Sequence, residues 1–199
     1  MTEWASVKRS EITWHTPVNI QFGFSGVDAT RALLITKSLL KENWPHIGRP
    51  NKCVYIIRLS GDFAVQYPRD FSPVIYVGEG AAHSRLQSHA SNWLVDLARG
   101  IQGIGVDIRV AEVARKNHAT FYQYIEADML DMFQRAYGSL PWFNQQRETS
   151  KKGWYPWDDD AMRDLTKNLG IGSGKKFIWA IQPTKNHPYI DEFNKGNLV

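Results

Sequence analysis

Cysteine is nearly absent from this sequence: Cys53 is the one cysteine among 199 residues. A disulfide within the chain is therefore excluded, and so is a zinc site built from several cysteines. The first residues lack the apolar segment of a signal peptide, and no apolar run reaches membrane-spanning length. We therefore expect a cytoplasmic protein without a membrane partner.

The excess of one sign of charge is also small: the net charge is only +4, and no polybasic tail is present. This mild basic excess permits nucleic-acid binding without requiring it, and an ordinary basic protein fits equally well. The sequence has no internal repeat and no low-complexity segment. Its 43% of hydrophobic residues is enough for a folded core, so global disorder is not expected.

The centre of the chain carries the clearest secondary-structure pattern. Runs of β-branched and aromatic residues predict strands, and apolar residues at helical spacing predict helices. The expected elements are strands over 53–59, 74–78 and 105–114, and helices over 82–99 and 119–138. We interpret 61–73 as a loop. The order strand, strand, helix, strand, helix predicts an α/β (α+β) fold, with a small three-stranded core sheet and flanking helices.

Two extensions flank this core, which we place at 51–147. The N-terminal extension, 1–50, offers an edge strand within 12–24 and a helix over 30–44 that Asp28 or Thr30 could cap. The C-terminal extension, 148–199, is expected to hold a helix from Asp159 to the glycine at 170, capped by Asp158. A strand over 175–183 follows it.

Several polar residues fall in this layout where chemistry could take place. Tyr55 and Tyr76 lie in the first two strands, and Arg85 and His89 are four residues apart, so they share a helix face. Glu126 interrupts an apolar helical stripe, where a carboxylate is costly unless it is paired or holds a cation. Asn144 follows the second helix.

The ordered set resembles the GIY-YIG nuclease superfamily. Cys53-Val54-Tyr55 matches the first tripeptide of that superfamily, and Tyr76-Val77-Gly78 matches the second. The conserved arginine, glutamate and asparagine of the superfamily match Arg85, Glu126 and Asn144, and the Arg85–His89 pair resembles its restriction endonucleases. The resemblance covers about residues 52–147. Departures are Cys53 in place of glycine, valines in place of isoleucines, and a longer segment between the tripeptides.

The resemblance implies a metal-dependent endonuclease that hydrolyses double-stranded DNA, of a restriction or defence type. It implies that Glu126 holds one Mg²⁺ or Mn²⁺ per active site and that Arg85 neutralises the phosphate. Tyr55, Tyr76 or His89 would serve as general base or relay. Gly78 and Gly80 would let the backbone approach the phosphate, and Asn144 would fix the geometry. A homodimer would cut both strands of a palindrome.

Other interpretations stay open. Taken singly, these residues fit structural roles: core tyrosines, a solvated arginine and a surface ion pair. The domain could also be a nucleic-acid-binding module whose catalysis has decayed, or a nuclease for RNA or branched DNA. Base contacts are expected from 60–73 and the flanks, and backbone contacts from four lysines: Lys151, Lys152, Lys175 and Lys176.

Two acidic or glycine-rich motifs do not indicate ligand sites. The three aspartates at 158–160 begin a helix, so capping explains them better than metal binding. The glycine-rich segment 170–176 lacks the spacing of a nucleotide-binding loop and precedes a strand.

Overall fold

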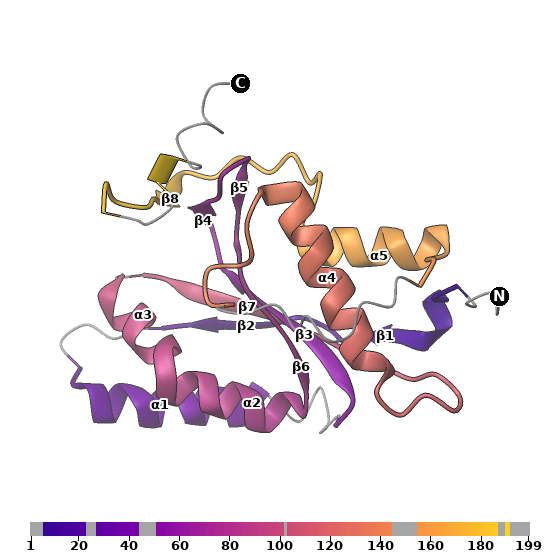
Figure 1. The fold of residues 1–199 in the computed structure, drawn as a ribbon. Helices are drawn as coiled ribbons and strands as arrows, with labels where there is room; N and C mark the ends of the chain where they lie inside the picture. Colours follow the sequence, from indigo (N-terminus) through magenta and orange to yellow (C-terminus); the bar gives the residue numbers. More distant parts are fainter. Residues whose placement is uncertain are drawn as a thin grey trace.

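A computed structural model describes residues 6–22, 27–43, 51–101, 103–144, 155–186 and 190–191. It has the mixed α+β fold that the sequence predicts (Figure 1). The helices are η1 (Arg9–Glu11), α1 (Ala29–Asn43), α2 (Ala82–His89), η3 (Ala90–Leu94), α3 (Val95–Gly100), α4 (Phe121–Tyr137) and α5 (Asp159–Leu169). The strands are β1 (Ile12–Trp14), β2 (Val18–Gln21), β3 (Cys53–Leu59), β4 (Phe63–Gln66), β5 (Phe71–Ser72), β6 (Val74–Gly80), β7 (Gly105–Val113) and β8 (Trp179–Ile181).

The main sheet has the order β1-β7-β3-β6, and β2 also pairs with β7. All of its pairings are antiparallel. The three predicted strands lie side by side in it as β7-β3-β6, which confirms that part of the fold. The sheet is nevertheless larger than the predicted three strands, because β1 and β2 pair with opposite ends of β7. The N-terminal extension therefore supplies two edge strands.

Helices cover both faces of the main sheet. Figure 1 shows α1, α2 and α3 together on one side, and α4 with α5 on the other. Because strand side chains alternate between faces, Tyr55 and Arg58 point in opposite directions. Arg58 donates to the Asn168 carbonyl of α5, so Tyr55 lies on the face that α2 covers.

The segment 61–73 is more ordered than the predicted loop. It contains β4 and β5, which form a second sheet with β8 in the order β5-β4-β8. The loop prediction was wrong because β4 pairs in parallel with β8, with Phe63 opposite Trp179, a partner that no local pattern reveals. The predicted strand over 175–183 is shortened to the three residues of β8.

The long helices are confirmed, with one difference. The helix predicted over 82–99 runs through α2, η3 and α3, and η3 is a π-helical turn that the pattern did not predict. Helix α4 ends at Gly138, whose φ of 87° lies in the left-handed region that favours glycine. Asp158 caps α5 through the Ala161 N–H, and Asp28 accepts from the Arg31 N–H. Within the described residues, no helix has the length and apolar character needed to cross a membrane.

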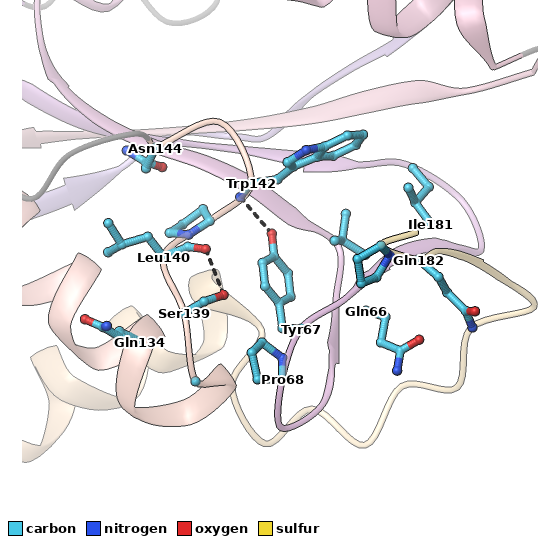
Figure 2. Close-up of a pocket in the computed structure, with 14 residues that line it drawn as sticks. Gln66, Tyr67, Pro68, Gln134, Ser139, Leu140, Trp142, Asn144, Ile181 and Gln182 are labelled. Atoms are coloured by element: carbon cyan, nitrogen blue, oxygen red, sulfur yellow. Dashed lines mark hydrogen bonds between the residues drawn. The ribbon is translucent and has the colours of Figure 1, made fainter. Parts of the chain in front are cut away.

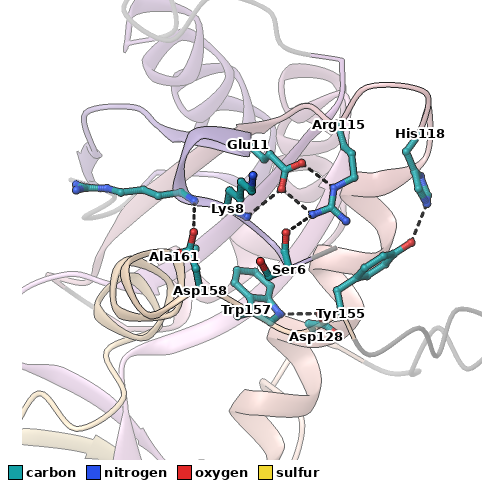
Figure 3. Close-up of polar contacts among 11 residues, drawn as sticks. Ser6, Lys8, Glu11, Arg115, His118, Asp128, Tyr155, Trp157, Asp158 and Ala161 are labelled. Atoms are coloured by element: carbon teal, nitrogen blue, oxygen red, sulfur yellow. Dashed lines mark hydrogen bonds and ion pairs between the residues drawn. The ribbon is translucent and has the colours of Figure 1, made fainter. Parts of the chain in front are cut away.

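A polar network, here called the Arg115 cluster, fastens both extensions to the core (Figure 3). The Arg115 guanidinium donates to both carboxylate oxygens of Glu11, each at 2.7 Å, and to the Ser6 carbonyl. His118 and the Tyr155 hydroxyl are 3.0 Å apart. The cluster consists of Ser6, Glu11, Arg115, His118 and Tyr155.

Candidate active site

Tyr55 and Tyr76 lie side by side on one face of β3 and β6. Their rings are stacked, with centroids 5.9 Å apart. Gly78 is the register partner of Tyr55, and a Cβ atom there would lie 2.6 Å from the Tyr55 hydroxyl and from the Tyr76 ring. The absence of a side chain at residue 78 therefore makes room for the two rings to lie together.

Gly80 allows the backbone to take a left-handed conformation at the end of β6. Its φ of 98° is in the region that favours glycine. The thiol of Cys53 donates to the Gly80 carbonyl at 2.7 Å. Burial raises the pKa of Cys53 to about 12, so this residue is a neutral thiol that holds the end of the hairpin rather than a nucleophile.

His89 extends from α2 to both tyrosines. Its Nε2 atom is 2.8 Å from the Tyr55 hydroxyl, and its ring centroid is 4.4 Å from that of Tyr76. Its Nδ1 atom accepts a hydrogen bond of 3.2 Å from the indole N–H of Trp93. Burial and, to a lesser extent, the charge of Arg85 lower the pKa of His89 to about 4, so the ring is neutral at neutral pH.

Arg85 brings a positive charge to these residues. Its Nη2 atom is 3.5 Å from the Tyr76 hydroxyl, at the limit of a hydrogen bond. The residue is exposed and forms no ion pair with any carboxylate among the described residues. Burial raises the pKa of Tyr55, while the charge of Arg85 acts in the opposite direction. We call Tyr55, Tyr76, Arg85 and His89 the Tyr55 cluster.

Asn144 lies at the outer edge of β6. Its side-chain oxygen accepts from the Val77 N–H at 2.9 Å, and its side-chain nitrogen donates to the Val77 carbonyl at 2.7 Å. Both bonds are to the backbone of the residue that follows Tyr76. Asn144 therefore acts on the Tyr55 cluster through the strand that carries Tyr76.

Glu126 lies on α4, the helix on the other side of the main sheet from α2 (Figure 1). It is 6% exposed and belongs to the face of α4 that packs against β3 and β6. The contacts that join the Tyr55 cluster run through α2 and η3, and Glu126 has no part in them. The structure thus brings four of the six predicted side chains together, links Asn144 to them through the backbone of β6, and has Glu126 on a different helix from Arg85 and His89.

Glu126 is the single carboxylate that we predicted as a metal ligand. Among the residues that the structure describes, no three His, Cys, Asp or Glu side chains are grouped so that they could hold an ion. Mg²⁺ commonly takes only one or two protein carboxylates and completes its shell with phosphate oxygens and water. One carboxylate such as Glu126 fits that type of donor set.

The four predicted lysines lie elsewhere. Lys151 and Lys152 are outside the described residues. The Lys175 ammonium donates to the Gly61 carbonyl at 2.5 Å and lies 5.1 Å from the Phe177 ring centroid. Lys176 is exposed on the same segment. Both described lysines therefore belong to the surface beside the second sheet.

A pocket of about 650 Å³ opens between α4, β4 and the C-terminal extension (Figure 2). Asn144 is one of its lining residues, and Trp142, 44% exposed, is another. Tyr67 lies beside Trp142, and its hydroxyl accepts from the Trp142 N–H. The lining contains no charged side chain: Val65, Gln66, Tyr67, Pro68, Gln134, Gly138, Ser139, Leu140, Pro141, Trp142, Asn144, Ile181, Gln182 and Pro183. Its chemistry suits a neutral ligand with a flat apolar face.

Two aromatic residues at the site were not predicted. Trp93 contacts His89, and the Phe143 ring is stacked on Trp93 at 4.0 Å. The spacing of Arg85, His89 and Trp93 at successive intervals of four is a signal that could have identified the tryptophan. Phe143 carries no such signal, because it belongs to a turn whose position depends on the tertiary fold.

Comparisons of the chain with models of protein families, with curated proteins and with solved structures found no match.

Proposed function

We propose that this protein is a metal-dependent endonuclease of the GIY-YIG type, which hydrolyses phosphodiester bonds of double-stranded DNA. The observation that carries the proposal is the Tyr55 cluster. Two tyrosine hydroxyls, a neutral histidine and an arginine without a carboxylate partner in the described structure converge from β3, β6 and α2. Such a group of donors beside an uncompensated cation suits an anionic substrate.

Each residue of the cluster has a distinct part in phosphodiester hydrolysis. Arg85 would bind a non-bridging phosphate oxygen and stabilise the charge that develops in the transition state. Tyr55 would orient the attacking water through its hydroxyl oxygen. It could take the proton of that water as a phenolate, after its own proton has passed to bulk solvent. Stacking on Tyr76 and the hydrogen bond to His89 hold the Tyr55 ring in one position.

Glu126 would hold the divalent cation, Mg²⁺ or Mn²⁺. When bound, such an ion stabilises the leaving oxygen of a phosphodiester and polarises the phosphate. The contribution of this chain is an acidic oxygen from α4, whose position depends on the packing of that helix against β3 and β6.

The pocket in Figure 2 would receive bases of the nucleic acid. Trp142 is stacked on Phe143 at 4.7 Å, and Phe143 is stacked on Trp93, so an aromatic series joins the pocket to His89. Gln66 and Gln182 supply side-chain amides, which can both donate to and accept from base edges. Aromatic faces of this kind bind bases by stacking.

We further propose a cytoplasmic restriction or defence role. The described parts of the extensions join the core: β1 and β2 pair with β7, and β8 pairs with β4. Cutting both strands of a palindromic site requires two active sites, which a homodimer would supply.

A specific observation favours a second candidate, a GIY-YIG-like module that binds nucleic acid without cutting it. Cys53 replaces the first glycine of the motif, and Glu126 is the single carboxylate predicted to hold the metal. A domain that had lost metal-dependent chemistry could retain the Arg85 cation and the base pocket. RNA or branched DNA remains an alternative substrate for an active enzyme.

A cleavage assay tests these proposals. Wild-type protein is incubated with supercoiled plasmid and genomic DNA, with Mg²⁺, with Mn²⁺ or with EDTA. The variant Glu126→Gln tests the metal ligand, and Asp128→Asn is its matched control, because Asp128 is a half-buried carboxylate two residues along the same helix. We expect metal-dependent fragments from wild type and Asp128→Asn, and loss of cutting in Glu126→Gln.

The same assay separates the alternatives. Tight DNA binding without cutting by all three proteins supports the binding module and contradicts the nuclease. Cutting confined to RNA or branched DNA would support the nuclease activity and change its proposed substrate. Trp142→Ala should weaken binding of DNA by roughly 5- to 100-fold if a base stacks on this side chain, and unchanged affinity would exclude it from the interface.

A further inference from the structure

Trp93 contacts the one ring nitrogen of His89 that does not face Tyr55. Its indole nitrogen is 3.2 Å from Nδ1 of His89, and Nε2 is 2.8 Å from the Tyr55 hydroxyl. An indole N–H donates hydrogen bonds and cannot accept them. The Nδ1 atom must therefore accept from Trp93 with its lone pair, which it can do only when it carries no proton.

The proton of His89 then has one remaining position. A neutral imidazole carries a single N–H, and with Nδ1 acting as acceptor the hydrogen is on Nε2. The lowered pKa of His89, about 4, agrees with a neutral ring at neutral pH. The Nε2–H group points at the Tyr55 oxygen, so the 2.8 Å contact has His89 as donor and Tyr55 as acceptor.

The orientation of the Trp93 donor is itself fixed by packing. The Trp93 ring lies on Phe143 with an interplanar angle of 11°, and the Phe143 N–H donates to the Ile75 carbonyl of β6. Trp93 belongs to the π-helical turn η3, and such turns occur frequently at functional sites. The indole is thus held between the helix and the edge of the main sheet.

We propose that Trp93 is a positioning residue that keeps His89 protonated on Nε2, so that His89 donates to Tyr55 and does not take its proton. The catalytic meaning of this inference rests on the proposed nuclease function. The hydroxyl hydrogen of Tyr55 is directed away from His89, and a negative charge on the Tyr55 oxygen is stabilised by the histidine N–H. His89 therefore orients Tyr55 and is not the final proton acceptor.

Nitrogen-15 NMR of His89 tests the proposal at neutral pH. Long-range proton–nitrogen spectra distinguish a ring protonated on Nε2 from one protonated on Nδ1 or on both. We expect the Nε2-protonated pattern in wild type and a mixture of both neutral forms in Trp93→Phe, which keeps an aromatic ring but lacks the N–H donor. Phe143→Tyr is the matched control, because it changes a neighbouring residue while keeping both the stacked ring and the indole donor.

Cleavage kinetics supply the second measurement. Trp93→Phe should cut DNA about tenfold more slowly at saturating substrate, which corresponds to the loss of one ordinary hydrogen bond. A wild-type ring protonated on Nδ1, or on both nitrogens, overturns the proposal whatever the variants do. So does a Trp93→Phe protein with the wild-type nitrogen pattern. The NMR result needs no cleavage, so inactivity of the wild-type enzyme would reject the nuclease function separately.

Discussion

Within the described residues, two hydrogen-bonded tyrosine–histidine pairs have an arginine nearby, and they differ in the environment of that arginine. In the Tyr55 cluster, Tyr55 and His89 are 2.8 Å apart and Arg85 has no carboxylate partner in the described structure. In the Arg115 cluster, the corresponding tyrosine–histidine distance is 3.0 Å, but Glu11 neutralises Arg115 through two hydrogen bonds.

The comparison teaches that the counter-ion separates a structural arginine from one that can bind a ligand. Arg115 lies 3.9 Å from the Phe121 ring centroid and forms an ion pair with Glu11. Its charge is therefore neutralised by partners within the fold. Arg85 is exposed beside two tyrosine hydroxyls. An unneutralised guanidinium in that position is available to an anion from outside.

The largest expected effect comes from removing one hydroxyl group in each pair. Tyr55→Phe should slow DNA cleavage by roughly 10²- to 10⁴-fold, the usual contribution of a group that moves a proton. Tyr155→Phe removes the equivalent hydroxyl from the Arg115 cluster. It should lower the free energy of unfolding by about 1 kcal/mol and leave the cleavage rate unchanged. Single-turnover cleavage and urea unfolding measure the two effects. Equal losses of activity in both variants would end the distinction between the pairs.

The two arginines should respond in opposite ways to alanine substitution. Arg85→Ala should slow cleavage by roughly 10²- to 10³-fold and change the free energy of unfolding by no more than about 0.5 kcal/mol. Arg115→Ala should lower that free energy by about 3 kcal/mol, because Glu11 is left mostly buried without its partner. Its cleavage rate should be normal in conditions where it is folded. A strongly destabilised Arg85→Ala protein with normal turnover would contradict the assignment.

The two regions should also differ in the sign of their pH dependence. The folded-state pKa of His89, about 4, lies below the ordinary value of 6.5, so its stabilising contribution is complete above pH 6.5 and is lost as the pH falls toward 4. Wild type should therefore gain about 3 kcal/mol of unfolding free energy relative to His89→Gln between pH 4 and pH 7.

Asp128, which accepts from the Trp157 indole near the Arg115 cluster, provides the comparison. Burial raises its pKa from 3.8 to about 6, so its stabilising contribution is present below pH 3.8 and is lost as the pH rises through 6. Wild type should lose about 2 kcal/mol relative to Asp128→Asn over that interval. Denaturant unfolding at several pH values measures both differences, and two differences of the same sign would contradict the environments described for these residues.

Much of the fold could be predicted because its central elements have strong local patterns. The strands β3, β6 and β7 are short runs of β-branched residues, and α4 has an apolar stripe that ends at Gly138. The second sheet could not be predicted, since β4 has four residues and its partner β8 is more than a hundred residues away in the sequence. Its formation depends on tertiary packing, which leaves no periodic signal.

The candidate site also has a part that local patterns could predict and a part that they could not. Helical spacing placed Arg85 and His89 on one face, and strand pairing placed Tyr55 beside Tyr76, as the structure has them. The position of Glu126 could not be predicted, because a buried position in a helical stripe does not specify which face of the sheet the helix covers. That choice is made by the connection between β7 and α4, which crosses to the face opposite α2.

The hydrogen bonds of Asn144 have a consequence for self-association. An edge strand with open backbone groups is a template on which another chain can add a strand. In β6, the outward-facing N–H and carbonyl of Val77 are both bonded to the Asn144 side chain, and the Ile75 carbonyl accepts from the Phe143 N–H. This side of the main sheet is therefore closed to strand addition from a second molecule at those residues. The proposed homodimer would have to assemble through another surface, and Asn144 protects the protein against edge-to-edge aggregation.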